Sequence, residues 1–169
     1  MRTRCSASRL LALLTAGAAL TAGPASGQVS AGVQANWGSD TDFGLGARIS
    51  VALDGVAVGF EAVGSFDYFF PSDDFGADLT YWEANANLVY RIDAAGELLT
   101  PYVGAGFAYT RFEASIRVLG AEASGNETSA GINLLAGLMF NLGGVTPFIE
   151  GKIEAGGGEQ FVASAGVRF

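Results

Sequence analysis

Apolar and polar residues alternate through most of the chain, and the pattern is clearest in the last nine residues, 161–169. Every odd position there is apolar, whereas the even positions are mostly small or polar. A period of two residues is typical of a β-strand whose two faces lie in different environments. An isolated strand with such an apolar face would aggregate in water. We therefore expect it to belong to a larger, closed sheet.

Eight segments of the chain show this period. The predicted strands are 29–37, 43–53, 56–70, 79–92, 101–111, 130–142, 145–155 and 161–169. Most are close to the roughly nine to eleven residues with which a tilted strand crosses a bilayer. Asp54-Gly55 predicts a two-residue hairpin turn, and Gly143-Gly144 predicts a second tight turn. The longest predicted connection is 112–127, within which 116–119 can extend the flanking strands.

The charged residues indicate which face of the strands is wet. Within the strand cores they share a face with Gly, Ser and Asn: Arg48, Glu61, Asp67, Glu83, Arg91, Glu150, Lys152, Glu154 and Arg168. A soluble barrel of the lipocalin type, the disfavoured alternative, would have an apolar interior and a charged exterior. An apolar outside and a polar inside are typical of membrane barrels. The sequence therefore predicts an all-β fold, an eight-stranded antiparallel up-and-down transmembrane β-barrel.

Aromatic residues gather near the ends of the predicted strands. One end carries Trp37, Phe43, Phe66, Tyr68, Trp82 and Tyr109, and the other carries Tyr90, Phe140 and Phe169. Aromatic girdles are expected where the apolar band of a barrel meets the lipid headgroups. Strand propensity alone would explain the aromatic residues but not their position at strand ends.

The first 27 residues have the features of a cleaved signal peptide. Three Arg residues precede the apolar run 10–20, which is too short to span a bilayer, and the small residues Ala25-Ser26-Gly27 follow. We expect residues 1–27 to be removed and 28–169 to form the barrel domain, with the mature chain starting near Gln28. Cys5 would leave with the signal, so the mature chain would contain no Cys and no disulfide.

Charge and composition narrow the classes of function. Without its leader the chain has a net charge of −11, which argues against nucleic acid as a partner. The chain has no His, the usual general base of hydrolytic enzymes. We therefore expect no enzymatic activity and no cofactor. Acidic residues in two predicted connections (Asp73, Asp74, Asp78, Glu122 and Glu127) lack the spacing of a calcium loop, so a solvated loop is favoured over a metal site.

The inward charges predict an ion-pair network inside the barrel. Its expected members are Arg48, Glu61, Glu83, Glu150 and Lys152. Counting back from a two-residue turn at Asp54-Gly55 places Ile49 opposite Phe60 and Arg48 opposite Glu61. The expected ion pair is therefore Arg48–Glu61, with Lys152 and Glu150 as an extension across the lumen. A role in ion pairs is favoured over a role as catalytic carboxylates for Glu61, Glu83 and Glu150.

Two short motifs resemble a known family. The segment Thr-Pro-Tyr-Val-Gly-Ala-Gly at 100–106 and the ending Gly-Val-Arg-Phe at 166–169 resemble the small outer-membrane β-barrel domains, which include the OmpA-type transmembrane domain, OmpX and opacity-like proteins. The resemblance covers 28–169 and implies a Gram-negative outer membrane, with lipid and lipopolysaccharide around the barrel. It also implies that the barrel-assembly machinery reads the last strand, which points to Phe161, Val167 and Phe169.

The function expected from these features is a structural or interaction role at the cell surface; the alternative is a narrow, porin-like pore or carrier for small solutes. Eight strands enclose a space that side chains can fill, and the expected fillers are Tyr81, Tyr102, Leu135, Met139 and Phe148. Inward glycines (Gly32, Gly44, Gly46, Gly59, Gly104 and Gly106) would leave a water-filled pocket or, as favoured here, ease the curvature of the strands and allow close packing.

The predicted loops at 38–42 and 156–159 are short, unlike those of long-looped adhesins. We expect a monomer with its tight turns, 54–55, 93–99 and 143–144, in the periplasm.

Overall fold

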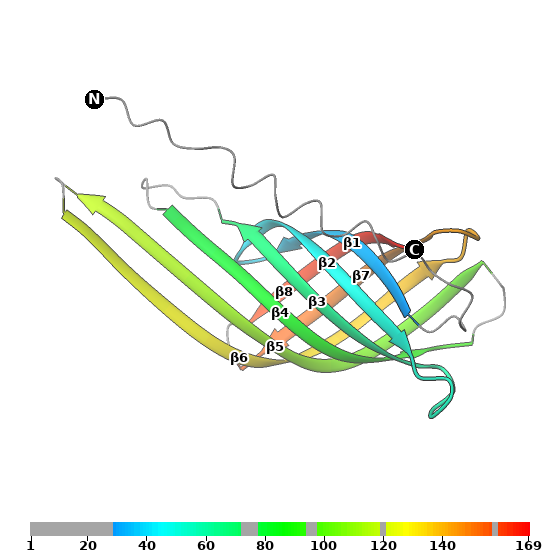
Figure 1. The fold of residues 1–169 in the computed structure, drawn as a ribbon. Helices are drawn as coiled ribbons and strands as arrows, with labels where there is room; N and C mark the ends of the chain where they lie inside the picture. The colour runs from blue at the N-terminus through cyan, green and yellow to red at the C-terminus, as the bar shows by residue number, and fades with distance from the viewer. Residues whose placement is uncertain (1–28, 72–77, 94–97, 119–120, 157–158) are drawn as a thin grey trace.

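The computed structural model describes residues 29–71, 78–93, 98–118, 121–156 and 159–169, which form a closed antiparallel barrel of eight strands (Figure 1). The strands are β1 (Val29–Gly38), β2 (Asp42–Ala52), β3 (Phe60–Phe70), β4 (Asp78–Arg91), β5 (Leu99–Val118), β6 (Ala121–Phe140), β7 (Thr146–Ala155) and β8 (Gln160–Arg168). Each strand pairs with its neighbours in sequence, and β1 pairs with β8. The predicted fold class is confirmed. The predicted signal peptide, 1–27, lies outside the described residues.

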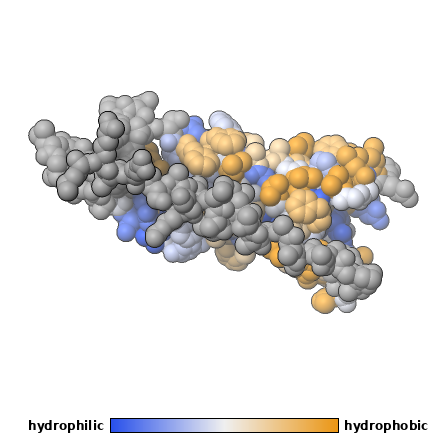
Figure 2. Space-filling model, turned by 45° about the horizontal axis from the view of Figure 1, so that its top comes forward, coloured by the Kyte–Doolittle hydropathy of each residue, from blue (hydrophilic) through white to orange (hydrophobic). Residues whose placement is uncertain are grey.

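Alternation along the strands separates an apolar outer wall from a polar interior. On β1, for example, Val33 points outward and is 53% exposed, whereas Gln34 points inward and is 6% exposed. Figure 2 shows large apolar side chains, in orange, over much of the visible wall. Because such a wall would be unstable in water, the distribution is that of a transmembrane barrel. No helix in the described part of the chain is long and apolar enough to cross a membrane.

The two ends of the barrel differ. At one end, here called the turn end, lie the connections 53–59, 92–98 and 141–145 together with the C-terminus. At the opposite end, the loop end, β1 passes to β2 through residues 39–41. The seam between β1 and β8 closes the sheet, and at the turn end Ala31 and Phe169 exchange two backbone hydrogen bonds, of 3.1 and 2.9 Å.

The prediction of a two-residue turn at Asp54-Gly55 is wrong. Strand β3 begins at Phe60 rather than at residue 56, and residues 53–59 form the connection. Ile49 therefore faces Gly64 instead of Phe60, and Arg48 faces Ser65 instead of Glu61. The register is shifted by four residues from the predicted one. An even shift leaves every side chain on its expected face, so the alternation of the sequence could not reveal it.

The longer connection is favoured by hydrogen bonds that a tight turn would lack. The Asp54 carboxylate accepts a 2.9 Å hydrogen bond from the backbone N–H of Gly59 and two, of 2.7 and 2.8 Å, from Arg91. Gly59 has φ +82°, which favours glycine, so this predicted inward glycine is a turn residue instead. At Gly143-Gly144, by contrast, the register of β6 and β7 leaves two residues between Leu142 and Val145, as predicted.

The predicted loop 112–127 is also largely wrong. Strands β5 and β6 both have 20 residues and pair with each other from Leu99 and Phe140 to Val118 and Ala121. Strand β7 pairs with β6 only between Ile132 and Met139. The outer half of the β5–β6 hairpin therefore extends past the rim of the barrel, as Figure 1 shows at the upper left. The polar sequence of this half suggested a loop because neither face of the extension needs to be apolar.

Candidate functional site: the barrel interior

The interior at the turn end is organised around two arginines. Arg168, on β8, lies 2.9 Å from a carboxylate oxygen of Glu61 and donates hydrogen bonds to Ser30 and to the sulfur of Met139. Arg91 pairs with Asp54 at the mouth, where both side chains are partly exposed. Between these two ion pairs lies a cavity of about 530 Å³ that opens at the turn end. Neither pair leaves a charge without a counter-charge.

A second layer of side chains crosses the middle of the barrel. Arg48 on β2 reaches across the lumen to Glu150 on β7, at 2.6 Å. The other oxygen of Glu150 accepts a 2.8 Å hydrogen bond from the Tyr102 hydroxyl, and the Arg48 guanidinium lies 4.3 Å from the ring centroid of Phe148. Buried apolar side chains pack around this layer: Val63, Val89, Tyr102, Leu135, Met139 and Phe148. This includes four of the five residues expected to fill the lumen.

Toward the loop end, one lysine lies between two carboxylates. Lys152 forms ion pairs with Glu83 on β4 and with Glu154 on its own strand. Gln160 donates a 2.7 Å hydrogen bond to Glu154 and contacts the hydroxyl of Tyr81, the fifth expected filler. All three charged side chains are almost completely buried. The layer therefore carries a net charge of −1, and Lys152 is its only cation among the described residues.

Asp67 is held by neutral donors. Its carboxylate accepts hydrogen bonds from Gln34 and Asn36, both at 2.7 Å, and from Ser65 and Asn85. Asn133 extends this network by donating to Asn85 at 2.7 Å and to Asn87. A buried carboxylate costs little when several donors satisfy its oxygens. The amides thus link β1, β3, β4 and β6 across the lumen.

Inward glycines make room for the large side chains of neighbouring strands. A Cβ atom on Gly137 would lie 2.4 Å from the ring of Tyr102, and one on Gly166 would lie 2.6 Å from the ring of Phe148. Likewise, a Cβ on Gly46 would collide with the carboxylate of Asp67. Packing of large against small residues, the favoured explanation of the inward glycines, is therefore what the structure shows at these positions.

Side chains in the middle of these layers are almost completely buried. The exposed fraction is 0% for Glu83, 2% for Asp67, 2% for Phe148 and 3% for Tyr102. Side chains that line an open aqueous channel would be reached by water, and these are not. The arrangement can hold the strands together and carry buried charge.

The structure brings some of the expected network together and separates other members. Arg48 contacts Glu150, and Lys152 contacts Glu83. The expected pair Arg48–Glu61 is wrong: Glu61 pairs with Arg168 instead. The four-residue register shift is the reason, because it moves Glu61 toward the turn end, away from Arg48. The sequence placed Arg168, Glu154 and Asp67 inside the barrel but did not predict their partners. For Asp67, the inward-facing amide side chains on β1, β4 and β6 could have indicated hydrogen-bond donors.

The aromatic residues lie on the outer wall, most of them toward the strand ends. Tyr109 is not at a strand end as predicted, because β5 runs from Leu99 to Val118. Near the loop end their rings form a chain in which Phe66 contacts Trp82, and Trp82 contacts Tyr109, with centroids 5.5 and 5.8 Å apart. Trp37 lies opposite Phe43, which stacks on Phe70, and Tyr68 meets Phe70 edge-on. Near the turn end Tyr90 packs on Phe60 at 5.0 Å, and Phe140 pairs with Leu99. A role as headgroup-level girdles stays a prediction.

The three residues of the expected assembly signal also lie on the outer wall. Phe161 and Phe169 are 45% and 63% exposed. Phe161 lies near the loop end of β8, which begins at Gln160. Its ring covers Gly151 of β7, since a Cβ there would lie 3.4 Å from it. Val167 pairs with Val33 of β1.

The Asp54–Arg91 pair at the mouth predicts a response to acid. The hydrogen bonds from Arg91 and from the Gly59 N–H lower the pKa of Asp54 below its usual value of 3.8. Because the pKa of Asp54 is lower in the folded protein than in the unfolded chain, the ion pair stabilises the fold fully at any pH above the unfolded-state pKa. This stabilisation is lost as the pH falls through the lower, folded-state pKa. Protection of the Gly59 amide from hydrogen exchange should therefore persist until the pH is below 3.8. Asp54→Asn should abolish this pH dependence, and a midpoint above the usual value would contradict the assignment.

Comparison with known proteins bears on the fold. No protein-family model matches the sequence, and no curated protein is significantly similar to it. Among solved structures, the N-terminal β-barrel domain of Pseudomonas aeruginosa OprF matches with a TM-score of 0.59 and 20% identity, over 83% of this chain and 96% of that one. Neisserial surface protein A matches with a TM-score of 0.57 and 19% identity, over 83% and 94%. The attachment invasion locus protein Ail of Yersinia pestis matches with a TM-score of 0.52 and 17% identity, over 84% and 97%.

Sequence identities of 17–20% support a shared fold and nothing more specific. The neighbours share the closed ring of strands, and the chain covers nearly the whole of each. The resemblance inferred from 100–106 and 166–169 is thereby confirmed at the level of architecture: this chain has the fold of the small eight-stranded outer-membrane β-barrels.

Proposed function

We propose that the protein is exported, loses residues 1–27 and resides in the outer membrane of a Gram-negative cell as a barrel with a structural or interaction role. Lipid and lipopolysaccharide surround it, and the barrel-assembly machinery inserts it. The observation that carries the proposal is the combination of an apolar outer wall with a lumen filled by ion-paired and hydrogen-bonded side chains. Such a barrel is stable in a bilayer without serving as a passage through it.

The alternative, a narrow pore or carrier, requires a path past the side chains that occupy the lumen. Arg48, Glu150, Tyr102 and Phe148 occupy the middle of the lumen. We therefore expect no stepwise single-channel conductance when refolded protein is added to a planar bilayer. Heat-modifiable migration on a gel would show that the barrel is folded in the same preparation. Reproducible unitary steps from folded wild-type protein would favour the pore.

The control for this measurement removes the central layer. Tyr102→Ala with Phe148→Ala should leave the Arg48–Glu150 pair in a wider, hydrated lumen and give brief conducting events. If the folded double variant conducts and the wild type does not, the central layer is the barrier. If neither conducts, the barrier lies elsewhere and the assignment to this layer is wrong.

The long β5–β6 hairpin supports an interaction role. Pairing between β6 and β7 begins at Ile132, so among the described residues the edge of β6 from residue 121 to 131 has no strand beside it on the β7 side. Exposed polar residues such as Asn126, Glu127 and Thr128 lie along it. An unpaired strand edge that projects from the membrane is accessible to a partner. Deletion of 111–128, which removes these polar residues together with their partners on β5, should leave the barrel folded and abolish the binding of wild-type protein to cells or matrix.

The last residue provides a test of assembly. Deleting Phe169 removes an exposed aromatic side chain and the two hydrogen bonds that its backbone exchanges with Ala31. We expect secretion to continue but the amount of heat-modifiable barrel in the outer membrane to fall. Phe169→Tyr, which keeps the ring and the backbone, should assemble normally. Wild-type levels of folded barrel without Phe169 would contradict the role.

A further inference from the structure

The β2–β3 connection presents the two most exposed large apolar side chains among the described residues. Val56 is 92% exposed and Val58 is 81% exposed. Together with Ala57 they form the apolar tip, defined here as residues 56–58. Other strongly exposed apolar residues, such as Phe107 at 70%, lie on the wall of the barrel, where lipid covers them. The apolar tip lies beyond the strands, so the wall itself does not explain it.

The apolar tip has a defined conformation. The backbone N–H groups of Val56 and Ala57 both donate to the carbonyl of Leu53, at 2.8 Å. Phe60 and Leu53 continue the ladder, with a 2.8 Å hydrogen bond from Leu53 to Phe60. At the base, Asp54 is bound by Arg91 and by the Gly59 N–H. These contacts hold the valines outward rather than letting them fold onto the barrel.

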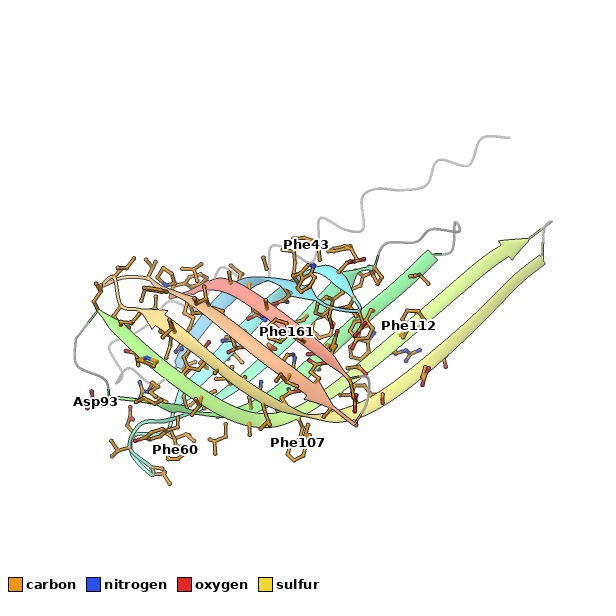
Figure 3. The ribbon with its side chains drawn as sticks, turned by 180° about the vertical axis from the view of Figure 1, so that it is seen from behind. Phe43, Phe60, Asp93, Phe107, Phe112 and Phe161 are labelled. Atoms are coloured by element: carbon orange, nitrogen blue, oxygen red, sulfur yellow. The ribbon has the colours of Figure 1, made fainter. Side chains whose placement is uncertain are left out.

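The apolar tip points to the outer side of the wall. In Figures 1 and 3 the connection bends away from the barrel, and in Figure 3 it lies on the side toward which Phe107 points. At its base the rings of Phe60 and Tyr90 are in tilted contact on the outer wall. The cavity at the mouth is lined by Asp54, Val58 and Gly59 of this connection but not by Val56. Val56 therefore continues the apolar outer surface, whereas Val58 also borders the mouth of the cavity.

We propose that the apolar tip inserts into the lipid interface at the turn end of the barrel and that its partner is a phospholipid surface. This inference rests on the proposed membrane location. Transfer of valine side chains from water to an apolar environment is favourable. The charges at the base do not oppose insertion, because Asp54 and Arg91 neutralise each other. The inserted tip sets the depth of the barrel in the leaflet at its turn end.

The test places a fluorescent probe on the tip. Cys5 is the only cysteine of the chain, so Val56→Cys in a Cys5→Ser background gives one labelling site for an environment-sensitive dye. The labelled barrel is refolded into phosphatidylcholine vesicles that carry a nitroxide either near the headgroup or deep in the acyl chain. Two control positions are Val33→Cys, outward on β1, and Thr128→Cys, exposed on the projecting hairpin.

The expected result is a several-fold loss of emission at Val56 with the shallow nitroxide and a smaller loss with the deep one. Val33 should be quenched by the deep nitroxide, and Thr128 by neither. Val58→Cys repeats the measurement if the first variant folds poorly. If Val33 is quenched while Val56 behaves like Thr128, the tip lies in water and the inference fails although the membrane location stands. If Val33 is not quenched, the membrane location itself fails.

A protein partner would give a different outcome. A dye at Val56 that no lipid nitroxide quenches, and that iodide in solution does not reach either, would be covered by protein, such as a second copy of the chain. That result would overturn the lipid assignment.

Discussion

Replacing Lys152 by Met should destabilise the barrel more than any other single change in its charged interior. Lys152 is the cation for both Glu83 and Glu154, and the side chains of all three are at most 6% exposed. Loss of one partner of a buried ion pair typically costs about 3–5 kcal/mol, because the remaining charge stays buried. We expect a loss of that size in the free energy of unfolding, measured by urea titration of the refolded barrel in lipid vesicles.

Two further variants show whether the loss comes from unpaired charge. Lys152→Met combined with Glu83→Gln and Glu154→Gln should recover much of the stability, since no buried charge is left without a partner. Arg91→Met is the matched control: it also removes a cation from an ion pair, but at the partly exposed mouth, where such pairs contribute about 0–1 kcal/mol. Equal losses for Lys152→Met and Arg91→Met would show that the buried triad has no special role.

The second large effect is expected at the pair Arg48–Glu150. Glu150→Gln leaves the Arg48 guanidinium buried and removes an acceptor of the Tyr102 hydroxyl. We expect a loss of about 3–5 kcal/mol for this single change. Arg48→Met combined with Glu150→Gln should cost less than the sum of the singles, with a coupling energy of roughly 0.5–3 kcal/mol.

The same cycle with Glu61 in place of Glu150 distinguishes the observed register from the one that the sequence predicts. Arg48 and Glu61 share no ion-pair partner, because Glu61 pairs with Arg168. The two substitutions should therefore be nearly additive, within about 0.5 kcal/mol. A large coupling energy between Arg48 and Glu61, with none between Arg48 and Glu150, would support the predicted register with the two-residue turn and contradict the observed one.

Alternation by itself determined the number of strands, the face of each residue and the choice between a membrane and a soluble barrel. These properties depend on the period of two and on where the charges lie, and both can be read locally. The position of Arg48, Glu83 and Lys152 inside the lumen follows from the same pattern. The turn at Gly143-Gly144 was also predictable, because glycine at both positions permits the backbone conformation that a two-residue turn needs.

Tertiary structure decided which inward residues meet. The register of β2 and β3 leaves a connection, 53–59, that is longer than the two-residue turn predicted from the sequence, and within it Asp54 meets Arg91 of β4. The partner of Arg48 comes from β7, on the far side of the lumen, at a separation that no local pattern encodes. The length of the β5–β6 hairpin was hidden because strands outside the membrane need no apolar face. A period of two determines which face of the sheet a residue is on, but any even shift of register leaves that face unchanged. Which residues meet across the lumen is therefore decided only when the strands have paired and the barrel has closed.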